Sequence, residues 1–319
     1  GIDSSIIVGL MARNSERPVK TFSIGYKDMP YFDETRYSRE VARFNKTEHY
    51  EFRLNYKDIL DSIPAVLETL DEPFADSSAV PTYVVSQETK RHVTVALAGD
   101  GADELFAGYR MYQGEFLAKY YSLLPSVLKE KVIEPFINIL PDSRDKKHSE
   151  YIRRFKKFTR GMSGSLAERF YGWQEIFPTD IRRKLIKHHF RDKISFQTGQ
   201  GIISQKLNEF AGDNINRMLY VEVKTSLPGD MLTKVDLMSM RNSLEVRVPF
   251  LDHEVVEFAF EMEGNVKLKG LKRKYILMET FKDILPPMLH NRSKWGFEMP
   301  IGVWLRKELK FLIDDFLSR

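Results

Sequence analysis

The sequence predicts an α/β protein, with a doubly wound parallel sheet in residues 1–112 and a large, mainly helical lobe in residues 113–319. Three observations predict it. In the first part, short β-rich segments alternate with segments of helical spacing, which is the order of a parallel sheet covered by helices. One short run, Val93–Ala98, is apolar nearly throughout, as expected for a strand buried on both faces. After about Tyr112, long helical patterns dominate and strand patterns become scarce.

The predicted elements of the first part follow one another closely. A helix begins near the start of the chain, with Asp3 or Ser4 as its cap. The elements after it are a strand at 19–24, a helix at 33–44, a strand at 49–52, a helix at 56–70, a turn-rich stretch at 71–78, a helix at 80–90 and the apolar strand at 93–98. In the helical lobe, residues 141–149 are predicted to form a mobile loop and residues 190–201 a second irregular connection.

Composition excludes several classes of protein. The 319 residues suffice for a large core in one domain or two. With 49 Lys and Arg against 45 Asp and Glu, the charge balance gives no argument for nucleic acid or a membrane as partner. No apolar run approaches the roughly 20 residues of a membrane helix. The absence of cysteine suits a cytoplasmic protein and leaves only oxygen or histidine to bind a metal.

The first five residues carry a possible phosphate site. Gly1, Asp3, Ser4 and Ser5 lie where a helix begins, and a helix N-terminus presents unpaired N–H groups and a positive dipole end. The hydroxyl groups of both serines would add donors. An ordinary helix cap explains the same residues, so this pattern alone is weak evidence.

The segment Gly99–Tyr109 is more informative. It places three glycines and three carboxylates, those of Asp100, Asp103 and Glu104, after the apolar strand, where open α/β sheets bind ligands. Three like charges within five residues repel one another, so a cation or a cationic partner is expected among them. Oxygen ligands suit Mg²⁺. The alternative is a solvated acidic turn at a helix start.

Three further segments are candidates. The polar, Pro-punctuated stretch 71–81 borders the predicted ligand crevice or is an ordinary loop. In 230–252, Glu245, Arg247 and Asp252 lie among apolar residues, so we expect them to be buried and either ion-paired or holding a ligand. The basic residues of 272–274 and Lys294 would neutralise phosphate charge or lie on a solvated helix end.

Taken together, these segments resemble the asparagine synthetase family, whose synthetase domain is a pyrophosphate-loop ATPase. The resemblance spans nearly the whole chain. Its motifs are Gly1–Ser5, similar to the end of the family's Ser-Gly-Gly-x-Asp-Ser-Ser loop, together with 71–81, 99–109, 243–252, Lys274 and Lys294. The fold it implies is the doubly wound sheet of the pyrophosphate-loop type with the helical lobe behind it.

The resemblance also implies a reaction. ATP and Mg²⁺ would activate the side-chain carboxylate of aspartate as a β-aspartyl-adenylate, and ammonia derived from glutamine would then form asparagine and AMP. By similarity, Asp3 and Asp103 hold the Mg²⁺ and Asp100 and Lys274 are catalytic. The residues that bind ATP would be Gly1, Asp3, Ser4, Ser5, Ile24, Ala98 and Gly99. Arg247 and Asp252 would support the site without touching substrate.

Two departures from the family pattern matter. The first Ser-Gly of the loop and the strand before it are absent, so we expect residues 1–319 alone to bind ATP poorly or not at all, and the natural chain to extend further in the N-terminal direction. The family's N-terminal glutaminase domain, headed by a catalytic cysteine, is also absent, and it is the partner that would supply ammonia. The C-terminus, soon after Trp304, falls where relatives continue. The oligomeric state is open, with a homodimer among the options.

Two alternatives remain at this point. A related amidotransferase or a β-lactam-synthetase-like ligase would share the nucleotide site and differ in the acceptor carboxylate. A non-catalytic binding module would keep the fold without the chemistry, although the retained Asp3, Asp100, Asp103 and Lys274 argue against it.

Overall fold

The computed structural model describes most of the chain, and the chain divides into two compact units. The first unit comprises Gly1–Ala102, Ser226–Ala259 and Ile276–Arg319, and the second comprises Asp103–Thr225 and Phe260–Tyr275. These bounds are not those of the predicted lobes, because the chain passes back into each unit. The residues that the structure describes are 1–319 without 28, 141–146, 161, 163, 192, 195–197, 291, 293–298 and 318–319.

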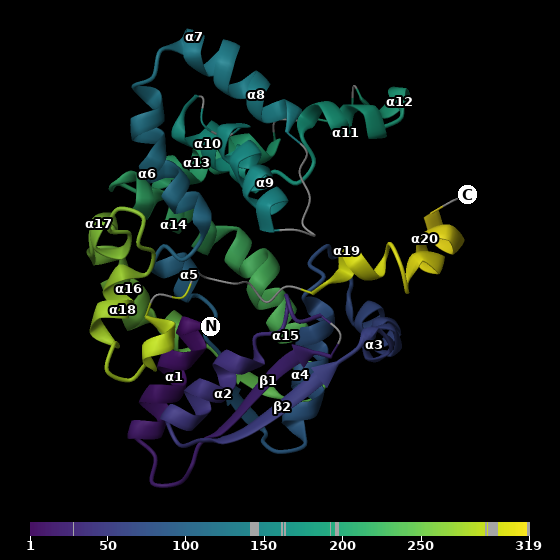
Figure 1. Ribbon diagram of the computed structural model, residues 1–319, viewed down its shortest axis with the longest axis vertical. Helices are drawn as coiled ribbons and strands as arrows, with labels where there is room; N and C mark the ends of the chain where they lie inside the picture. The colour runs from purple at the N-terminus through teal and green to yellow at the C-terminus, as the bar shows by residue number, and fades with distance from the viewer. Residues whose placement is uncertain are drawn as a thin grey trace. The chain divides into compact units, whose positions relative to one another are not determined.

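The alternation of strand and helix predicted for the N-terminal part is present in the first unit. Strand β1 pairs in parallel with β2, and Ile24 lies opposite Phe52 (Figure 1). Helix α2 packs on both strands, α3 on β2 and α4 on β1. The elements are α1 (Ile2–Arg13), β1 (Lys20–Tyr26), α2 (Thr35–Phe44), β2 (Glu48–Leu54), α3 (Tyr56–Thr69) and α4 (Ala79–Lys90).

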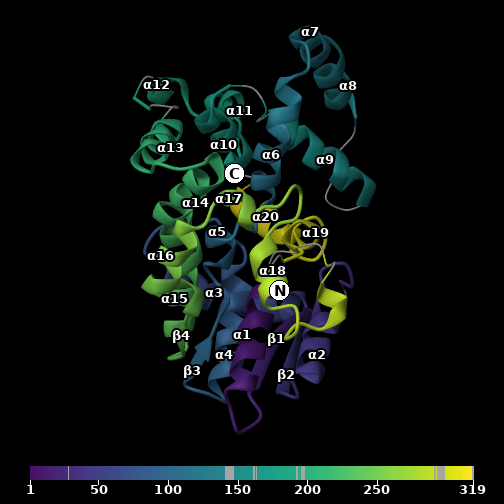
Figure 2. The same ribbon diagram turned by 90° about the vertical axis from the view of Figure 1, so that its left-hand side faces the viewer.

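A second parallel pair lies in the same unit. Strand β3 (Val95–Leu97) runs beside β4 (Glu245–Arg247), as Figure 2 shows. The described strands therefore form two sheets of two strands each, and one continuous doubly wound sheet is not confirmed. The prediction that β3 is buried on both faces is wrong: Val95 and Leu97 are 40% and 37% exposed. An apolar run shows only that a strand can be covered, and the face that carries these two side chains is open.

The core of the first unit forms around β1, β2 and α4. Its buried members come from distant parts of the sequence and include Ile24, Tyr26, Val80, Met238 and Trp304. The return of the chain supplies Met238 from α15 (Thr233–Met240) and Trp304 from α19 (Ile301–Trp304). Burial of these apolar side chains is what holds the three segments of the unit together.

The second unit is helical in its described residues. Its core brings together α6, α10, α13 and α14 around side chains such as Tyr112, Phe170 and Met218, all fully buried. The helices are α6 (Arg110–Ser122), α7 (Ser126–Leu128), η1 (Lys129–Ile133), α8 (Glu134–Ile139), α9 (Lys147–Arg160), α10 (Leu166–Gln174), α11 (Thr179–Leu185), α12 (His188–Arg191), α13 (Thr198–Glu209), α14 (Asn214–Lys224) and α17 (Gly264–Lys267). Helix α5 (Ala102–Leu105) begins at the boundary of the units.

The two predicted loops of the helical lobe have different outcomes. Residues 141–146 lie outside the described residues, and α9 already begins at Lys147. The expected irregular connection 190–201 is wrong at both ends, because Phe190 and Arg191 end α12 and Thr198 begins α13, while 192 and 195–197 lie outside the description. A Gly-containing segment such as 198–201 still forms a helix where neighbouring helices pack on it.

The rest of the described elements belong to the C-terminal half. They are η2 (Leu227–Leu232), α15 (Thr233–Met240), η3 (Pro249–Leu251), α16 (His253–Glu261), α18 (Tyr275–Thr280), η4 (Pro287–Leu289), α19 (Ile301–Trp304) and α20 (Lys310–Leu317). Within the residues that the structure describes, no helix has the length and apolar character that crossing a membrane demands.

Candidate active site

The start of α1 and the residues after β3 meet in the first unit. A methyl group added to Gly99 would lie 2.6 Å from the backbone nitrogen of Ser4 and 2.8 Å from Cβ of Asp3. Only glycine allows so close an approach of the two backbones. Two motifs that are almost a hundred residues apart in the sequence are thereby brought to one place, at the carboxyl end of a parallel strand.

The first turn of α1 is organised around Gly1. The cap residue is Gly1, not Asp3 or Ser4 as predicted, and no side chain caps the helix. The hydroxyl groups of Ser5 and Ser4 donate to the carbonyl oxygen of Gly1 at 2.6 Å and 3.3 Å. Asp3 lies inside the first turn, so its carboxylate is close to the positive end of the helix dipole.

The acidic turn continues from β3. Ala98 donates its N–H to the carbonyl oxygen of Arg247 at 2.9 Å, which keeps the strand end in the sheet. Gly101 has φ of +87°, and a methyl group there would collide with Leu251. Asp100 sits in this turn in the first unit, whereas Asp103, three residues later, belongs to the second.

Asp103 finds a cationic partner in the second unit. Its Oδ1 lies 2.5 Å from Nζ of Lys274, and the two side chains are only 17% and 5% exposed. Gly108 makes room for the pair, because a methyl group there would collide with both side chains. Lys274 is held with φ of +51°, and its N–H donates to the carbonyl oxygen of Phe106 at 3.2 Å. The cationic partner expected for this acidic segment is therefore Lys274, which lies in the basic segment 272–274.

Two further polar pairs of the second unit involve the buried carboxylates Glu104 and Glu222. The carboxylate of Glu104 accepts a short hydrogen bond from the hydroxyl of Tyr109, and Gln174 donates a short one to Glu222. Burial, followed by the charge of Glu104, raises the pKa of Tyr109, which therefore stays a neutral donor. Tyr109 ends the predicted segment 99–109, whereas Gln174 and Glu222 were not predicted, because helix spacing alone does not separate them from core residues.

A second cluster of charges, not predicted from the sequence, lies in the first unit. Nζ of Lys234 donates to Oδ2 of Asp76 at 2.6 Å, and the carboxyl of Asp230 lies beside that of Asp76. The three residues come from the segments 71–81 and 230–252. Their pairing could not be predicted because the partners are 158 positions apart.

Other predicted residues are placed differently. Glu245, Arg247 and Asp252 were expected to be buried, and this is wrong: all three are exposed, and the ion pair between Arg247 and Glu245 is 65% and 52% exposed. Glu245 and Arg247 flank Val246 in the short strand β4, so their side chains point to its open side, and Asp252 follows η3 (Pro249–Leu251). Ile24 is buried in the core of the first unit. Lys294 lies outside the described residues.

The described residues contain no group of three or more His, Cys, Asp or Glu side chains arranged to hold a metal ion. The carboxylates of Asp3 and Asp103 are of the right kind, because Mg²⁺ is commonly bound by one or two carboxylates together with phosphates and water. Asp3 belongs to the first unit and Asp103 to the second. Their joint binding of one ion stays a prediction.

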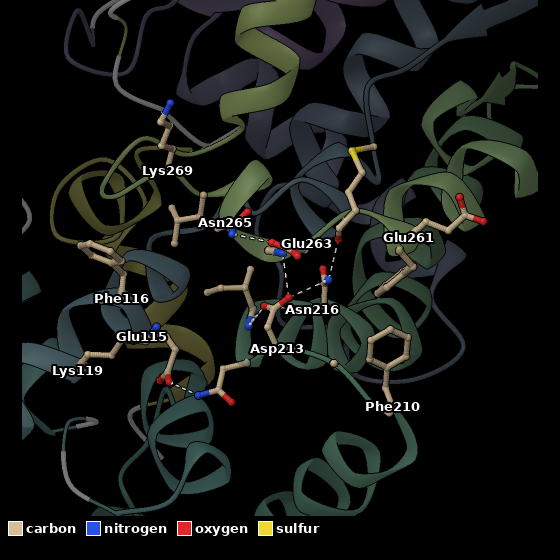
Figure 3. Close-up of a pocket in the computed structure, with 18 of the residues that line it drawn as sticks. Glu115, Phe116, Lys119, Phe210, Asp213, Asn216, Glu261, Glu263, Asn265 and Lys269 are labelled. Atoms are coloured by element: carbon tan, nitrogen blue, oxygen red, sulfur yellow. Dashed lines mark hydrogen bonds between the residues drawn. The ribbon is translucent and has the colours of Figure 1, made fainter.

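The second unit also has a hollow of about 680 Å³, shown in Figure 3, which none of the predicted site residues lines. Asp213 and Asn216 point toward each other in it. Asp213 accepts from the N–H groups of Ile215 and Gly264 at 2.9 Å, and Asn216 Oδ1 accepts from Nζ of the fully buried Lys267 at 2.7 Å. These bonds join α14 to α17 and give the residues a structural role.

The chain is similar to known proteins along its whole length. The family model described as asparagine synthase matches residues 1–319. The chain belongs to the asparagine synthase family. Among curated members, asparagine synthetase [glutamine-hydrolyzing] 1 of Bacillus subtilis is 34% identical over all of this chain, and a putative asparagine synthetase [glutamine-hydrolyzing] 2 of Methanocaldococcus jannaschii is 31% identical over 78% of it. An amidase of Penicillium rubens is similar at 21% identity over 98% of the chain. The chain spans 48%, 45% and 51% of the lengths of these three relatives.

Proposed function

We propose that the full-length protein is a glutamine-dependent asparagine synthetase, in which this chain supplies the part that uses ATP. The observation that carries the proposal is the contact between Gly99 and the start of α1, which puts Asp3 and Ser4 beside the residues that follow β3. A helix N-terminus at the carboxyl end of a parallel strand is suited to phosphate. Membership of the asparagine synthase family supports this assignment.

In the proposed reaction, the side-chain carboxylate of aspartate attacks the α-phosphorus of ATP, the bond to pyrophosphate breaks, and a β-aspartyl-adenylate forms. Ammonia then attacks the acyl carbon and AMP leaves. The first step is needed because a carboxylate is a poor acyl donor to ammonia until it carries a better leaving group. Gly1, Ser4 and Ser5 would bind phosphate, while Ile24, Ala98 and Gly99 would line the adenosine.

The charged residues of the site would bind Mg²⁺, position the reacting groups and neutralise developing charge. Asp3 and Asp103 would hold Mg²⁺, which when bound neutralises phosphate charge. Asp100 would position the reacting groups, and Lys274, held by Asp103 at 2.5 Å, would neutralise charge that develops in the transition state. Ammonia would come from glutamine through a glutaminase domain outside this chain.

The test is pyrophosphate release by the full-length protein with ATP, Mg²⁺ and a panel of carboxylates. We expect aspartate to be the preferred acceptor and asparagine to be the product. Release with a different carboxylate, and none with aspartate, would instead assign a related ligase. If no carboxylate supports release while ATP still binds, the protein is a non-catalytic member of the family.

A further inference from the structure

The cluster of Asp76, Asp230 and Lys234 joins three elements of the first unit. Asp76 lies in the turn before α4, Asp230 in η2 and Lys234 in the first turn of α15. The Lys234 side chain is 8% exposed, with its Nζ 2.6 Å from Asp76 and 3.6 Å from the sulfur of Met231. A lysine so deeply buried requires its carboxylate partner, so the cluster is held in one arrangement.

The topology places this cluster at the end of the unit where the strands finish. Helix α4 directly precedes β3 in the chain, and α15 directly precedes β4. The C-terminus of each helix therefore lies near the start of its strand, and the N-termini of both helices lie toward the carboxyl ends of these parallel strands. The two helices pack against each other. Gly99 and the start of α1 lie at the same end, beyond β3. The cluster and the proposed nucleotide site thus share one edge of the first unit.

The two carboxyl groups of the cluster differ in the hydrogen bonds that they accept. Asp76 accepts from the N–H of Ser78 at 2.9 Å and from its hydroxyl at 2.7 Å, in addition to Lys234. Burial alone would raise the pKa of Asp76, but Lys234 and Ser78 hold it below its ordinary value. Asp76 is therefore a fixed carboxylate that orients its neighbours.

Asp230 has a carboxyl oxygen that accepts no hydrogen bond from the described residues. This oxygen, Oδ1, is shielded from solvent, although the residue as a whole is only half-buried. Burial, and then the charge of Asp76, raise the pKa of Asp230. A carboxylate with an unused oxygen beside a fixed negative charge is well suited to take up a proton.

We propose that Asp230 is the base that accepts a proton from the attacking nitrogen in the amide-forming step, with Asp76 and Lys234 as positioning residues. This inference rests on the proposed function. Ammonia forms a C–N bond at the acyl carbon and leaves a positively charged nitrogen on the tetrahedral intermediate. That nitrogen gives one proton to the Asp230 carboxylate, the C–O bond to AMP breaks, and AMP departs with the bonding electrons. The proton on Asp230 then passes to solvent.

The experiment separates the two half-reactions in the full-length protein. Aspartate-dependent exchange of pyrophosphate into ATP measures adenylation, and asparagine formation from ammonia measures the second step. We expect Asp230→Asn to keep exchange within about threefold and to lower asparagine formation by roughly 100-fold, the usual contribution of a positioned base. Asp236→Asn is the matched control, because Asp236 is exposed on the adjoining helix α15, and we expect it to change neither rate.

A second nucleophile sharpens the test. The conjugate acid of hydroxylamine is much more acidic than ammonium, so its adduct loses a proton to water readily and depends less on a protein base. We expect Asp230→Asn to form the hydroxamate at close to the rate of the unaltered protein. Equal loss with both nucleophiles, loss of exchange together with asparagine formation, or retention of asparagine formation would each overturn the role of Asp230. Absence of aspartate-dependent exchange in the unaltered protein would instead refute the proposed function.

Discussion

Single glycines set the distance between backbone segments at the candidate site. Gly99 lies against the start of α1, and Gly108 against the pair of Asp103 and Lys274. At Gly99 the nearest atom is the backbone nitrogen of Ser4, and the backbone has little freedom to move away. The geometry of the proposed nucleotide site therefore depends on the absence of one methyl group.

We predict that Gly99→Ala destabilises the chain by about 1–3 kcal/mol, the usual cost of forcing an extra methyl group into a filled space. Urea unfolding followed by circular dichroism measures it. The control is Gly201→Ala in α13, where an added methyl group meets nothing within 4 Å and should stabilise the helix by roughly 0.5–1 kcal/mol. Equal stability of Gly99→Ala and the unaltered chain would contradict the close approach.

Lys267 makes stability depend on pH. Burial lowers its pKa from 10.5 to about 8. The pKa of Lys267 is lower in the folded state than in the unfolded state, so the unfolded chain binds a proton first as the pH falls. The contribution of Lys267 to the free energy of unfolding is therefore complete above pH 10.5 and is lost as the pH falls toward about 8. The full difference is on the order of 3 kcal/mol.

We therefore predict that the free energy of unfolding of the unaltered chain, relative to that of Lys267→Met, rises between pH 8 and 10.5. Chemical unfolding at several pH values measures the difference. Lys119→Met is the control, because Lys119 is an exposed lysine on α6, and its removal should leave the pH dependence unchanged. A parallel pH dependence in Lys267→Met and the unaltered chain would show that Lys267 is not the group responsible.

At the scale of elements, a buried ion pair joins α6 to α10. Glu115 accepts from Nε and Nη2 of Arg169, both at 2.8 Å, and from Asn214 at 2.7 Å, and its side chain is 3% exposed. Removing one partner leaves a buried charge without compensation, which is far more costly than the pair itself is stabilising.

We predict that Arg169→Met destabilises the chain by about 3–5 kcal/mol, while Lys206→Met, which removes a partly exposed pair with Glu209 on α13, costs less than about 1 kcal/mol. Thermal unfolding of both variants tests the contrast. Similar losses in the two variants would mean that burial does not decide the worth of these pairs.

For the whole molecule, the central feature is that the acidic segment after β3 is divided between the two units, with Asp100 in the first and Asp103 in the second. The proposed magnesium ligands are Asp3 and Asp103, and their joint binding of one ion stays a prediction. Its test is therefore functional and uses the full-length protein.

We predict that Asp3→Asn and Asp103→Asn each lower aspartate-dependent pyrophosphate release by roughly 100-fold or more. The double variant should release pyrophosphate as fast as the slower of the two single variants, because residues that act on one ion lose their effect together. Asp61→Asn on α3 changes an exposed carboxylate and should be neutral. Losses that multiply in the double variant would show that the two residues act separately.

Much of the local structure followed from the sequence. The helices and strands of the N-terminal part lie within a few residues of their predicted bounds, because side-chain periodicity and turn residues act over short distances. Gly99, Asp103 and Lys274 were also predicted as site residues, and their roles in the reaction stay predictions. Burial was less predictable: Val95 and Leu97 are exposed although the run is apolar, and Arg247 is exposed although its neighbours are apolar.

By itself, the sequence determined the order and type of the elements in the N-terminal part, the family, and a set of candidate carboxylates and glycines. Only the tertiary structure decided that Lys274 is the partner of Asp103 and that Lys234 binds Asp76 beside Asp230. The physical reason is that periodicity encodes which face of a segment is buried but not which distant segment covers it. Partners 158 positions apart meet only through the path of the folded chain, and that path decides which charges are compensated and which remain able to react.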